Sequence, residues 1–468
     1  MIKKIIFIFL LLSYSCYGFC QITFTKTYGG YRGYSVKQTN DGGYIVAGRT
    51  AEATYYGDVF LIRTDSVGDT LWTRTFGGSE DGWGYDVQQT NDGGYIVAGS
   101  LKSLWCFSFC TQDFFIIKTD VNGVTLWTKT GDINGAINIA YSIQQTVDSG
   151  YIMAGFTNIN GYSADKAFLA KLNTNGDTLW TKKYANNSFA YSVQQTYDGG
   201  YVFTGETGSP TDIYLVKTDS AGNVVWAKTF YGGKQYDAVG MSVQQTVDSG
   251  YVVGGYVRFS NNDLTAAYLI KTDKNGDSLW AKTYDGALYD NAFSVQQTND
   301  GGYIVAGQTK SFGAGMNDAW LIKTDAHGDT LWTKTYGRSG NDVARSVQQT
   351  TDGGYIITGQ TDGYGVWLIK TDSMGNAPPL KLSVSEVSTI QINFRVYPNP
   401  TTDGVTIDLG GEYKKTSIEI TNINGEQISK TNYINARLIQ LNVDAPTGVY
   451  LITVVSDSVV STVKLVKE

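Results

Sequence analysis

One short sequence recurs seven times and constrains the fold of this chain more than any other feature. Its last copy, residues 346–359, reads Ser-Val-Gln-Gln-Thr-Thr-Asp-Gly-Gly-Tyr-Ile-Ile-Thr-Gly. The second Gln of this sequence stands at Gln38, Gln89, Gln145, Gln195, Gln245, Gln297 and Gln349, with spacings of 50 to 56 residues. A regular period of this length, with strand-like segments inside it, indicates a repeat architecture.

Each repeat contains four candidate strands joined by short turns. In the sixth repeat the strands are expected at residues 292–298, 303–309, 318–324 and 330–336. The first hairpin turns through Asn-Asp-Gly-Gly and the second through Asp-Ala-His-Gly-Asp, and Gly suits such turns because it adopts positive φ without steric cost. No long amphipathic helical pattern occurs, and the 55 Gly, 33 Tyr and 10 Trp fit aromatic strands punctuated by Gly. The sequence therefore predicts an all-β fold.

The seventh repeat lacks a fourth strand of its own. Six repeats carry a fourth strand with a Trp, but the seventh ends without one. Residues 22–28 supply the missing sequence, because they align with residues 330–336, with Phe24 in the place of Trp332. If this N-terminal strand pairs with residues 366–371, the array closes into a ring. We therefore expect a seven-bladed β-propeller with four strands per blade, and not an open solenoid with dissimilar capping repeats.

The repeat resembles a known bacterial one. Gly-Gly-Tyr-Ile-Val-Ala-Gly, followed by Leu-Ile-Lys-Thr-Asp-x-x-Gly-Asp-x-Leu-Trp, is similar to the β-propeller repeat of exported bacterial proteins, and in outline to kelch and quinoprotein-type blades. The resemblance covers about residues 22–376, and it implies a propeller domain over residues 21–376. It implies no particular activity, because propellers host many unrelated functions.

The pattern of the sequence changes completely after the last repeat. Residues 377–393 are expected to form a linker, and residues 394–468 contain short alternating strands and turn sequences that predict a small β-sandwich. This last segment resembles the C-terminal type A sorting domain of the type IX secretion system of Bacteroidetes. The residues that carry the resemblance are Tyr397, Pro398, Asn399, Pro400, Gly425, Gly448, Tyr450, Lys464 and Lys467. The resemblance implies that the type IX machinery is a partner and that the protein reaches the medium or the outer-membrane surface through the periplasm.

The N-terminus has the pattern of a secretory signal. A lysine pair precedes an apolar stretch at residues 5–12, and small residues precede a cleavage site expected before Gln21, so residues 1–20 are predicted to be a signal peptide. Lipidation at Cys16 is an alternative. No other stretch reaches the roughly 20 apolar residues of a membrane-spanning helix.

Composition and residue context limit the possible cofactors and partners. The net charge of −7 argues against nucleic acid or an anionic membrane surface as partner. Cys106 and Cys110 lie in one loop, far in sequence from the only histidine, His327, so a local disulfide or two free thiols are expected, and not a metal site. The residue at the place of His327 varies between repeats, which gives no support to a Ser-His-Asp or Cys-His arrangement. We expect neither a metal nor a cofactor.

Two repeated polar features have both a ligand-binding and a structural interpretation. The second Gln of each repeat predicts either a ring of seven amides that binds a polar ligand or ion, or a hydrogen-bonded ring that joins the blades, because buried amides need partners in any case. The second hairpin turns, such as residues 273–277, are similar to calcium loops, but a strand resumes directly after each turn where a calcium loop continues to a distant carboxylate. We therefore interpret these turns as hairpins.

The loops on one face of the expected ring differ from blade to blade. Loops on a rigid scaffold are where binding and catalytic residues are usually found. Four aromatic residues on that side are candidates to stack on a sugar or pack against a protein partner: Tyr55, Tyr56, Trp83 and Trp105. The alternative is that they only cover the ends of the blades.

Two classes of function follow. The first is a non-catalytic binding or adhesion scaffold, displayed or released through the type IX route. The second is a polysaccharide-acting enzyme that uses loop carboxylates at the channel mouth, namely Asp81, Asp237, Asp290 and Asp342, since glycosidases need two carboxyl groups about 5–10 Å apart. A quinone-dependent dehydrogenase rests on blade resemblance alone, without a recognisable cofactor motif. The sequence favours the binding scaffold.

Overall fold

The protein is described from a computed structural model, in which every regular element of the described residues is a β-strand. The described residues are 21–50, 57–78, 80–103, 111–131, 133, 137–158, 165–208, 211–230, 237–259, 264–361, 365–379, 394–422, 426–456 and 459–468. The predicted all-β class is confirmed. The chain divides into two compact units, Met1–Leu380 and Lys381–Glu468. The expected signal peptide lies outside the described residues, as does nearly all of the expected linker.

Four kinds of strand recur along the first unit. The first strands are β2 (Arg32–Gln38), β6 (Asp81–Gln89), β10 (Ile137–Gln145), β14 (Ser188–Gln195), β18 (Ala238–Gln245), β22 (Asp290–Gln297) and β26 (Val343–Gln349). The second strands are β3 (Tyr44–Arg49), β7 (Tyr95–Lys102), β11 (Tyr151–Asn158), β15 (Tyr201–Gly208), β19 (Tyr251–Arg258), β23 (Tyr303–Thr309) and β27 (Tyr355–Gln360). The third strands are β4 (Val59–Thr64), β8 (Gln112–Thr119), β12 (Lys166–Leu172), β16 (Thr211–Thr218), β20 (Thr265–Thr272), β24 (Asp318–Thr324) and β28 (Val366–Thr371). The fourth strands are β5 (Thr70–Phe76), β9 (Thr125–Gly131), β13 (Thr178–Lys183), β17 (Val224–Phe230), β21 (Ser278–Tyr284) and β25 (Thr330–Tyr336), to which β1 (Phe24–Tyr28) corresponds in sequence.

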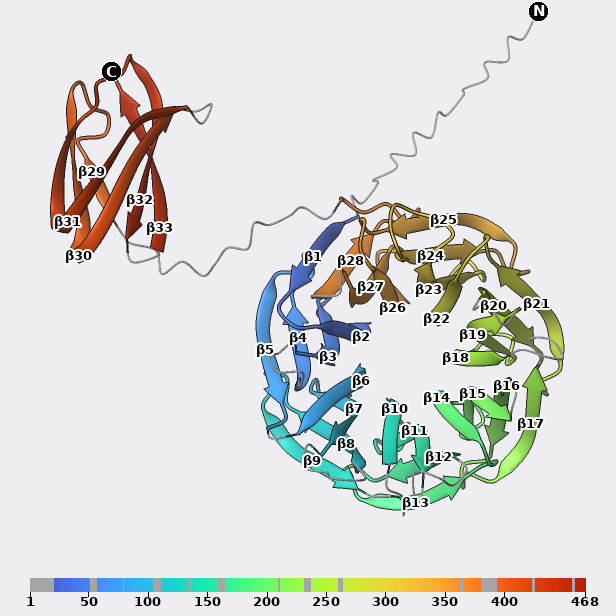
Figure 1. The fold of residues 1–468 in the computed structure, drawn as a ribbon. Coiled ribbons are helices and arrows are strands. Elements are labelled where there is room, and N and C mark those ends of the chain that lie inside the picture. The colour runs from blue at the N-terminus through green and yellow to red at the C-terminus, as the bar shows by residue number, and fades with distance from the viewer. Residues whose placement is uncertain are drawn as a thin grey trace, which may run out of the picture. The chain divides into compact units, whose positions relative to one another are not determined.

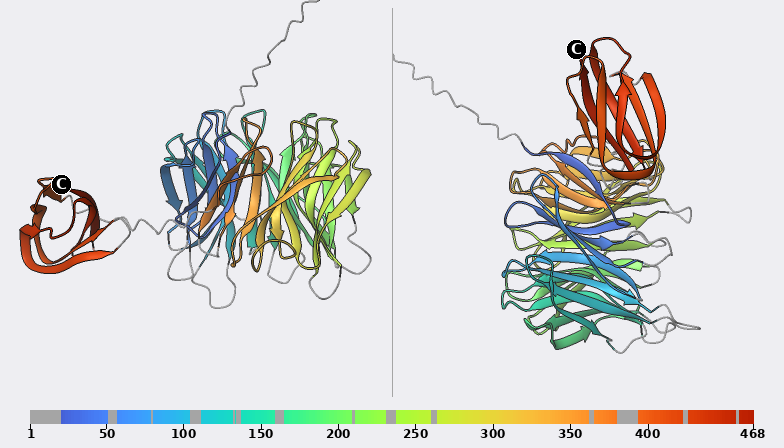
Figure 2. Two further views of the ribbon diagram at one scale, coloured as in Figure 1. Left: turned by 90° about the horizontal axis from the view of Figure 1, so that it is seen from above. Right: turned by 90° about the vertical axis from the view of Figure 1, so that its left-hand side faces the viewer.

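The strands of each repeat pair antiparallel in chain order. β1 pairs with β28 and takes the fourth place in the last sheet, with Phe24 opposite Lys370 and Tyr28 opposite Val366. A parallel bridge between Gln112 and Ile137 joins the second and third repeats into one eight-stranded sheet. The first strands lie innermost around a central opening and the fourth strands lie at the rim (Figure 1). In the side view the strands run between the two faces of this ring (Figure 2).

Burial follows the place of each strand in its sheet. In β23, Tyr303 to Gly307 are all buried, and so is the whole of β24, because side chains of neighbouring sheets cover both faces of the middle strands. The outer strand β25 instead alternates exposed and half-buried residues. The apolar core of the first unit therefore lies between the sheets.

The fourth strand of each repeat packs against the next repeat through an aromatic pair. Trp280 makes a T-shaped contact with Tyr303 at a centroid distance of 5.7 Å. The corresponding pairs are Trp72–Tyr95, Trp127–Tyr151, Trp180–Tyr201, Trp226–Tyr251, Trp332–Tyr355 and Phe24–Tyr44. A turn glycine of the next repeat, Gly328, lies so close that an added Cβ would stand 2.8 Å from the Trp280 ring. The recurring glycine is thus required by packing as well as by its positive φ.

A buried basic residue on the third strand holds the Asp of each first hairpin turn. In the third repeat, Lys171 Nζ lies 2.9 Å from Asp148 Oδ2 and donates to the Leu172 carbonyl at 3.1 Å, while Gly150 N donates to Asp148 Oδ1 at 3.0 Å. The equivalent pairs are Arg63–Asp41, Lys118–Asp92, Lys217–Asp198, Lys271–Asp248, Lys323–Asp300 and Lys370–Asp352. The protein itself therefore supplies the counter-charge of these carboxylates and holds the first hairpin turns.

The described residues of the second unit form five strands in one sheet, with their own apolar core. The strands are β29 (Arg395–Tyr397), β30 (Gly404–Asn422), β31 (Gln427–Asn442), β32 (Gly448–Ser456) and β33 (Val459–Lys467). The pairing of β30 with β31 shifts register between Asp408 and Tyr413. Ile407 and Ile420, from the two halves of β30, belong to the same core cluster. The long strands therefore contribute to this core from both sides of the register shift.

Candidate functional site

The first strands enclose a cavity of about 410 Å³ at the centre of the first unit. Three belts, each with one residue per repeat, form most of its walls, together with Ile143, Val193, Val243, Val295 and Val347. The aromatic belt is Tyr34, Tyr85, Tyr141, Tyr191, Met241, Phe293 and Arg345. The hydroxyl belt is Ser35, Asp86, Ser142, Ser192, Ser242, Ser294 and Ser346. The amide belt is Lys37, Gln88, Gln144, Gln194, Gln244, Gln296 and Gln348. The cavity has the size and the mixed lining of a small-molecule site.

A β-bulge at the same place in every first strand provides the residues of the aromatic belt. In β2 the register with β3 shifts between Gly33 and Ser35, which leaves Tyr34 as the extra residue. In β26 the shift falls between Ala344 and Ser346, which leaves Arg345 as the extra residue. The other five first strands shift at the corresponding residue. A bulged residue is free of the ladder and can be aimed in a new direction, here toward the cavity.

Members of the aromatic belt contact one another around part of the cavity. Ring centroids lie 5.0–5.3 Å apart in the pairs Tyr34–Tyr85, Tyr85–Tyr141 and Tyr141–Tyr191. The guanidinium of Arg345 lies 5.4 Å from the ring centres of both Tyr34 and Phe293, in cation–π geometry. The belt is therefore a packed wall in which one cation is inserted between two aromatic rings.

The hydroxyl and amide belts join neighbouring repeats. Val347 N donates to Ser294 Oγ at 3.2 Å, and Gln349 N donates to Gln296 Oε1 at 2.6 Å. The second Gln of the repeat has a similar role, since Asn299 N donates to Gln349 Oε1 at 2.9 Å. All seven second-Gln oxygens accept such a bond from the preceding repeat. Of the two interpretations of these amides, the hydrogen-bonded ring is the one observed, and the first Gln lines the cavity.

Three charged residues interrupt the belts on adjacent repeats. Arg345, Lys37 and Asp86 stand where the other repeats have mostly aromatic, Gln and Ser residues, respectively. Asp86 accepts hydrogen bonds from Ser35 Oγ at 2.8 Å and Ser142 Oγ at 3.2 Å. Sequence reasoning missed these residues, although their departure from the repeat is visible in the sequence.

Arg345 lacks a polar partner among the described residues. Its Nε is buried without a hydrogen-bond partner. Burial lowers the pKa of Arg345, and the nearby guanidinium of Arg32 lowers it further. The Nε of Arg32 is likewise buried without a partner in the described part of the chain. Two cations thus lie close together on the first and seventh repeats.

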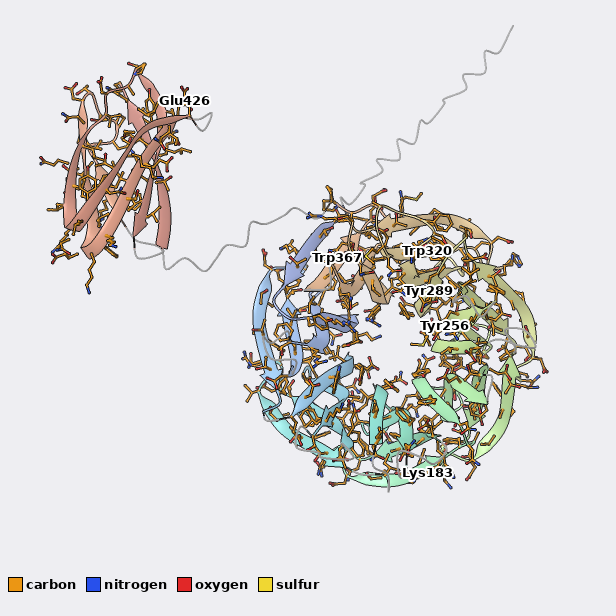
Figure 3. All side chains as sticks on the ribbon, in the orientation of Figure 1. Lys183, Tyr256, Tyr289, Trp320, Trp367 and Glu426 are labelled. Atoms are coloured by element: carbon orange, nitrogen blue, oxygen red, sulfur yellow. The ribbon has the colours of Figure 1, made fainter. Side chains whose placement is uncertain are left out.

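The far side of the ring carries acidic groups. Tyr191 Oη donates to Glu206 Oε1 at 2.8 Å. Burial raises the pKa of Glu206, and the charges of Asp237 and Asp165 raise it further, against the lowering effect of the Tyr191 hydrogen bond. Tyr256 lies toward the centre of the ring (Figure 3), and burial followed by the charge of Glu206 raises its pKa. Cations therefore lie beside β2 and β26, and carboxylates lie around β15, across the ring in Figure 1.

Trp83 is the one predicted aromatic anchor that lies in the described residues. We expected it in a loop, but it belongs to β6, because this strand extends to pair Asp81 with Lys102 and Trp83 with Ser100. Its half-buried ring is covered on one face by the Arg49 guanidinium at 4.4 Å. Tyr55, Tyr56 and Trp105 lie outside the described residues, as do Cys106, Cys110 and Cys16.

Two of the four candidate catalytic carboxylates form ion pairs. Asp81 is buried, pairs with Arg49, and accepts a hydrogen bond from Gly57 N at 2.9 Å. Asp237 pairs with Arg258 at 2.9 Å and accepts a hydrogen bond from Thr211 N at 3.1 Å. Both carboxylates connect neighbouring segments of the scaffold.

The other two candidate carboxylates are fully buried. Asp290 accepts hydrogen bonds from Ser311 Oγ at 2.6 Å, from Gly286 N at 2.8 Å and from the Thr309 hydroxyl. Asp342 accepts a hydrogen bond from Arg338 N at 2.9 Å. Each of the four carboxylates therefore has a structural partner in its own part of the ring, and no observation assigns any of them a catalytic role.

His327 lies in a hairpin turn. Its backbone N–H and that of Asp329 both donate to Asp325 Oδ1, at 2.8 Å each, which stabilises the turn. Among the described residues, no group of three or more His, Cys, Asp and Glu side chains is arranged to hold a metal ion. The described part of the chain likewise contains no helix that could cross a membrane.

Several of the predicted sorting residues connect the start of the second unit to its last strand. Asn399 Nδ2 donates to the Lys464 carbonyl at 2.7 Å, and Val466 N donates to Asn399 Oδ1 at 2.9 Å. Tyr450 Oη donates to the Pro446 carbonyl at 2.6 Å, and Lys467 Nζ donates to the Val443 carbonyl. Tyr397 is exposed, and Gly425 lies outside the described residues. The tight binding of the first segment to β33 makes the C-terminus part of the fold.

Comparison with known proteins gives a match for this second unit. Residues 395–468 match the family model of the secretion system C-terminal sorting domain. The regulatory protein FlaEY of Caulobacter vibrioides is 24% identical over 177 residues, which cover 32% of this chain and 18% of FlaEY. The chain thus spans less than a fifth of that relative.

Solved structures give weaker matches. PorZ, a surface component of the type IX secretion system of Porphyromonas gingivalis, has a TM-score of 0.44 at 12% identity, over 94% of this chain and 59% of PorZ. Sqt1 of Chaetomium thermophilum, solved bound to the N-terminus of ribosomal protein L10, has a TM-score of 0.45 at 10% identity, over 74% of this chain and 98% of Sqt1. The family match at residues 395–468 identifies a type IX sorting domain, and the chain is a secreted or outer-membrane surface protein that this domain directs to the secretion machinery.

Proposed function

We propose that this protein is a non-catalytic binding or adhesion scaffold, built as a seven-bladed β-propeller over residues 21–376 that the N-terminal strand closes. The observation that carries the proposal is the central cavity, which aromatic and polar side chains of the first strands line. A rigid ring holds such side chains in place before a ligand arrives, which lowers the entropic cost of binding.

Closure of the propeller is supported by contacts of Gln21, before β1, and of Gln38, in β2. Gln21 Nε2 donates to the Asp352 carbonyl at 2.6 Å, and Ser373 N donates to Gln21 Oε1 at 2.8 Å. At the inner edge, Thr351 N donates to Gln38 Oε1 at 2.9 Å, the same contact that joins the other neighbouring repeats. The first and last repeats therefore have the interface that the other repeats share.

The ligand is proposed to contact the face on which the first strands begin, where Trp83 and the aromatic belt lie. Trp105, Tyr55 and Tyr56 remain proposed contacts on the same sequence argument. A glycan and protein array probed with the purified protein tests this. Binding should be weakened at least tenfold by Trp83→Ala, but unchanged by Tyr197→Ala, a matched control because Tyr197 is exposed on the opposite turn face. The reverse result would place the ligand on the other face.

The remaining parts of the chain are proposed to serve export. Residues 1–20 would be a signal peptide, residues 377–393 a linker, and residues 394–468 a sorting domain whose curved sheet folds over its core as a small sandwich, in a bacterium of the Bacteroidetes. The common core of Ile407 and Ile420 supports the sandwich.

A further inference from the structure

We propose that the central cavity binds a small organic carboxylate, held by Arg345 and by four serine hydroxyls of the hydroxyl belt. The inference rests on the proposed binding function and names the chemical class of its ligand. The cavity volume of about 410 Å³ suits a ligand of monosaccharide size, or the end group of a longer chain.

The charge of Arg345 is not neutralised by the described residues. Its guanidinium lines the cavity between Tyr34 and Phe293, and its Nε is buried without a partner. The neighbouring Arg32 adds a second guanidinium that forms no ion pair in the described part of the chain. A buried charge is costly unless it is paired, and a planar guanidinium matches a carboxylate with two parallel hydrogen bonds. A bound carboxylate would supply the missing partner.

The hydroxyl belt offers donors on the repeat that carries Arg345 and on the three repeats that precede it. The oxygens of Ser192, Ser242, Ser294 and Ser346 each accept a backbone N–H from the next repeat, at 3.2–3.3 Å. None of these four hydroxyls donates to an acceptor among the described residues. A serine hydroxyl whose oxygen already accepts still has one proton to donate, and a carboxylate oxygen is an acceptor only. These four hydroxyls therefore complement Arg345.

The first and second repeats, which follow Arg345 around the ring, favour the same ligand orientation. The hydroxyls of Ser35 and Ser142 already donate to Asp86, so a second carboxylate is repelled there. Lys37, in the amide belt, adds a further positive charge to the wall. The tyrosine rings of the aromatic belt offer flat apolar surface to the body of the ligand, which can be a sugar ring or an aromatic ring.

Isothermal titration calorimetry on the purified full-length protein tests the inference. The probes are glucuronate and benzoate, each compared with its neutral counterpart, glucose and benzyl alcohol. At least one carboxylate should bind at least tenfold more tightly than its neutral counterpart, and the better of the two identifies the ligand body. Arg345→Met should remove this preference, whereas Arg74→Met, on the exposed strand β5, should keep it. Absence of binding by both carboxylates, or equal binding by Arg345→Met, would overturn the inference.

Two further measurements keep the test decisive. If Arg345→Met lacks the near-ultraviolet circular dichroism of the wild type, Arg345→Lys is measured in its place. Arg345→Lys should bind the carboxylate more weakly than the wild type does. The same variant should still bind the carboxylate more tightly than it binds the neutral counterpart, and loss of either difference would contradict the role of the charge. A polymer that binds the protein while neither carboxylate does would leave the proposed binding function intact and refute only this inference.

Discussion

The aromatic ring of Phe24 lies 5.9 Å from that of Tyr44 in a T-shaped contact with an interplanar angle of 62°. Trp332 makes the same contact with Tyr355, at 5.9 Å and 63°. The first of these pairs joins the N-terminal strand to the first repeat, and the second joins the sixth repeat to the seventh. Phe24 thus occupies the place that Trp has in the other fourth strands.

Phe24→Ala should lower the free energy of unfolding by about 3 kcal/mol, because the substitution leaves a cavity where a buried ring packs between two repeats. Phe24→Trp, which installs the residue of the other repeats, should cost less than about 1.5 kcal/mol. Urea denaturation measures both, with the exposed Leu331→Ala on β25 as the control. If Phe24→Ala unfolds at the same urea concentration as the wild type, β1 contributes little to the stability of the ring.

Substitutions at two turn glycines distinguish the cost of backbone strain from the cost of lost packing. Gly301 and Gly328 have positive φ angles of 83° and 77°, but an added Cβ meets nothing within 4 Å at Gly301 and lies 2.8 Å from the Trp280 ring at Gly328. Gly301→Ala should cost about 1 kcal/mol, the price of the left-handed backbone for a residue with Cβ. Gly328→Ala should cost at least about 1 kcal/mol more. Equal thermal shifts for the two variants would contradict the packing role of the second turn.

The turn aspartates should make the protein sensitive to acid. Burial alone would raise the pKa of Asp148, but hydrogen bonds from Thr146, Lys171 and Gly150 N, with the charge of Lys171, lower it to about 2. Because the folded pKa lies below the unfolded value of about 3.9, this carboxylate stabilises the fold above pH 4 and loses that effect as the pH falls toward 2. The same lowering of pKa recurs in the other six repeats, at Asp41, Asp92, Asp198, Asp248, Asp300 and Asp352.

Unfolding curves between pH 2 and pH 7 measure this effect. Asp148→Asn should reduce the change in unfolding free energy between pH 2 and pH 7 by about 1 kcal/mol. This value is discounted for solvent screening, because the Asp148 side chain is 58% exposed. The same substitution should also destabilise the protein at pH 7 more than Lys171→Met does. The reason is that Asp148→Asn leaves the charge of Lys171, whose side chain is only 6% exposed, without its partner. The opposite order would show that these ion pairs do not hold the turns.

The sequence predicts the strands and the sorting domain well because both depend on local patterns. The alternation of apolar residues, the turn glycines and the recurring Trp are visible in one repeat, and seven copies reinforce them. The pairing of 22–28 with 366–371 follows from a count of strands, and β1 does pair with β28. These features need no knowledge of how the repeats face one another.

The cavity could not be predicted in the same way. Which residue of the first strand lines it depends on a β-bulge that shifts the alternation at Tyr34 and at Arg345, and hydrophobic periodicity does not reveal a bulge. The burial of Lys171 was missed because a lysine within a strand usually indicates an exposed sheet edge. Its partner in the turn, Asp148, lies 23 residues away in the sequence, so the ion pair is not visible as a local pattern. Trp83 was placed in a loop because the extension of β6 depends on pairing with Lys102.

Removal of residues 395–468 should separate folding from export. The first unit forms its own core, so the shortened chain should fold and remain in the periplasm, while the intact chain reaches the surface or the medium. Cell fractionation with immunoblotting measures the distribution in a strain with working secretion machinery. Asn399→Ala, which breaks the contacts with β33, should reduce export in part. Surface delivery of the shortened chain would contradict the role of the sorting domain.

The protein is expected to bind its ligand without chemical change. A polysaccharide that the array identifies as bound is incubated with the purified protein at equimolar concentration, and its size distribution is followed by size-exclusion chromatography while binding is measured on the same sample. Saturable binding and an unchanged size distribution at all times are the expected result. Time-dependent shortening of the polymer that Asp81→Asn or Asp237→Asn abolishes would contradict it and establish an enzyme.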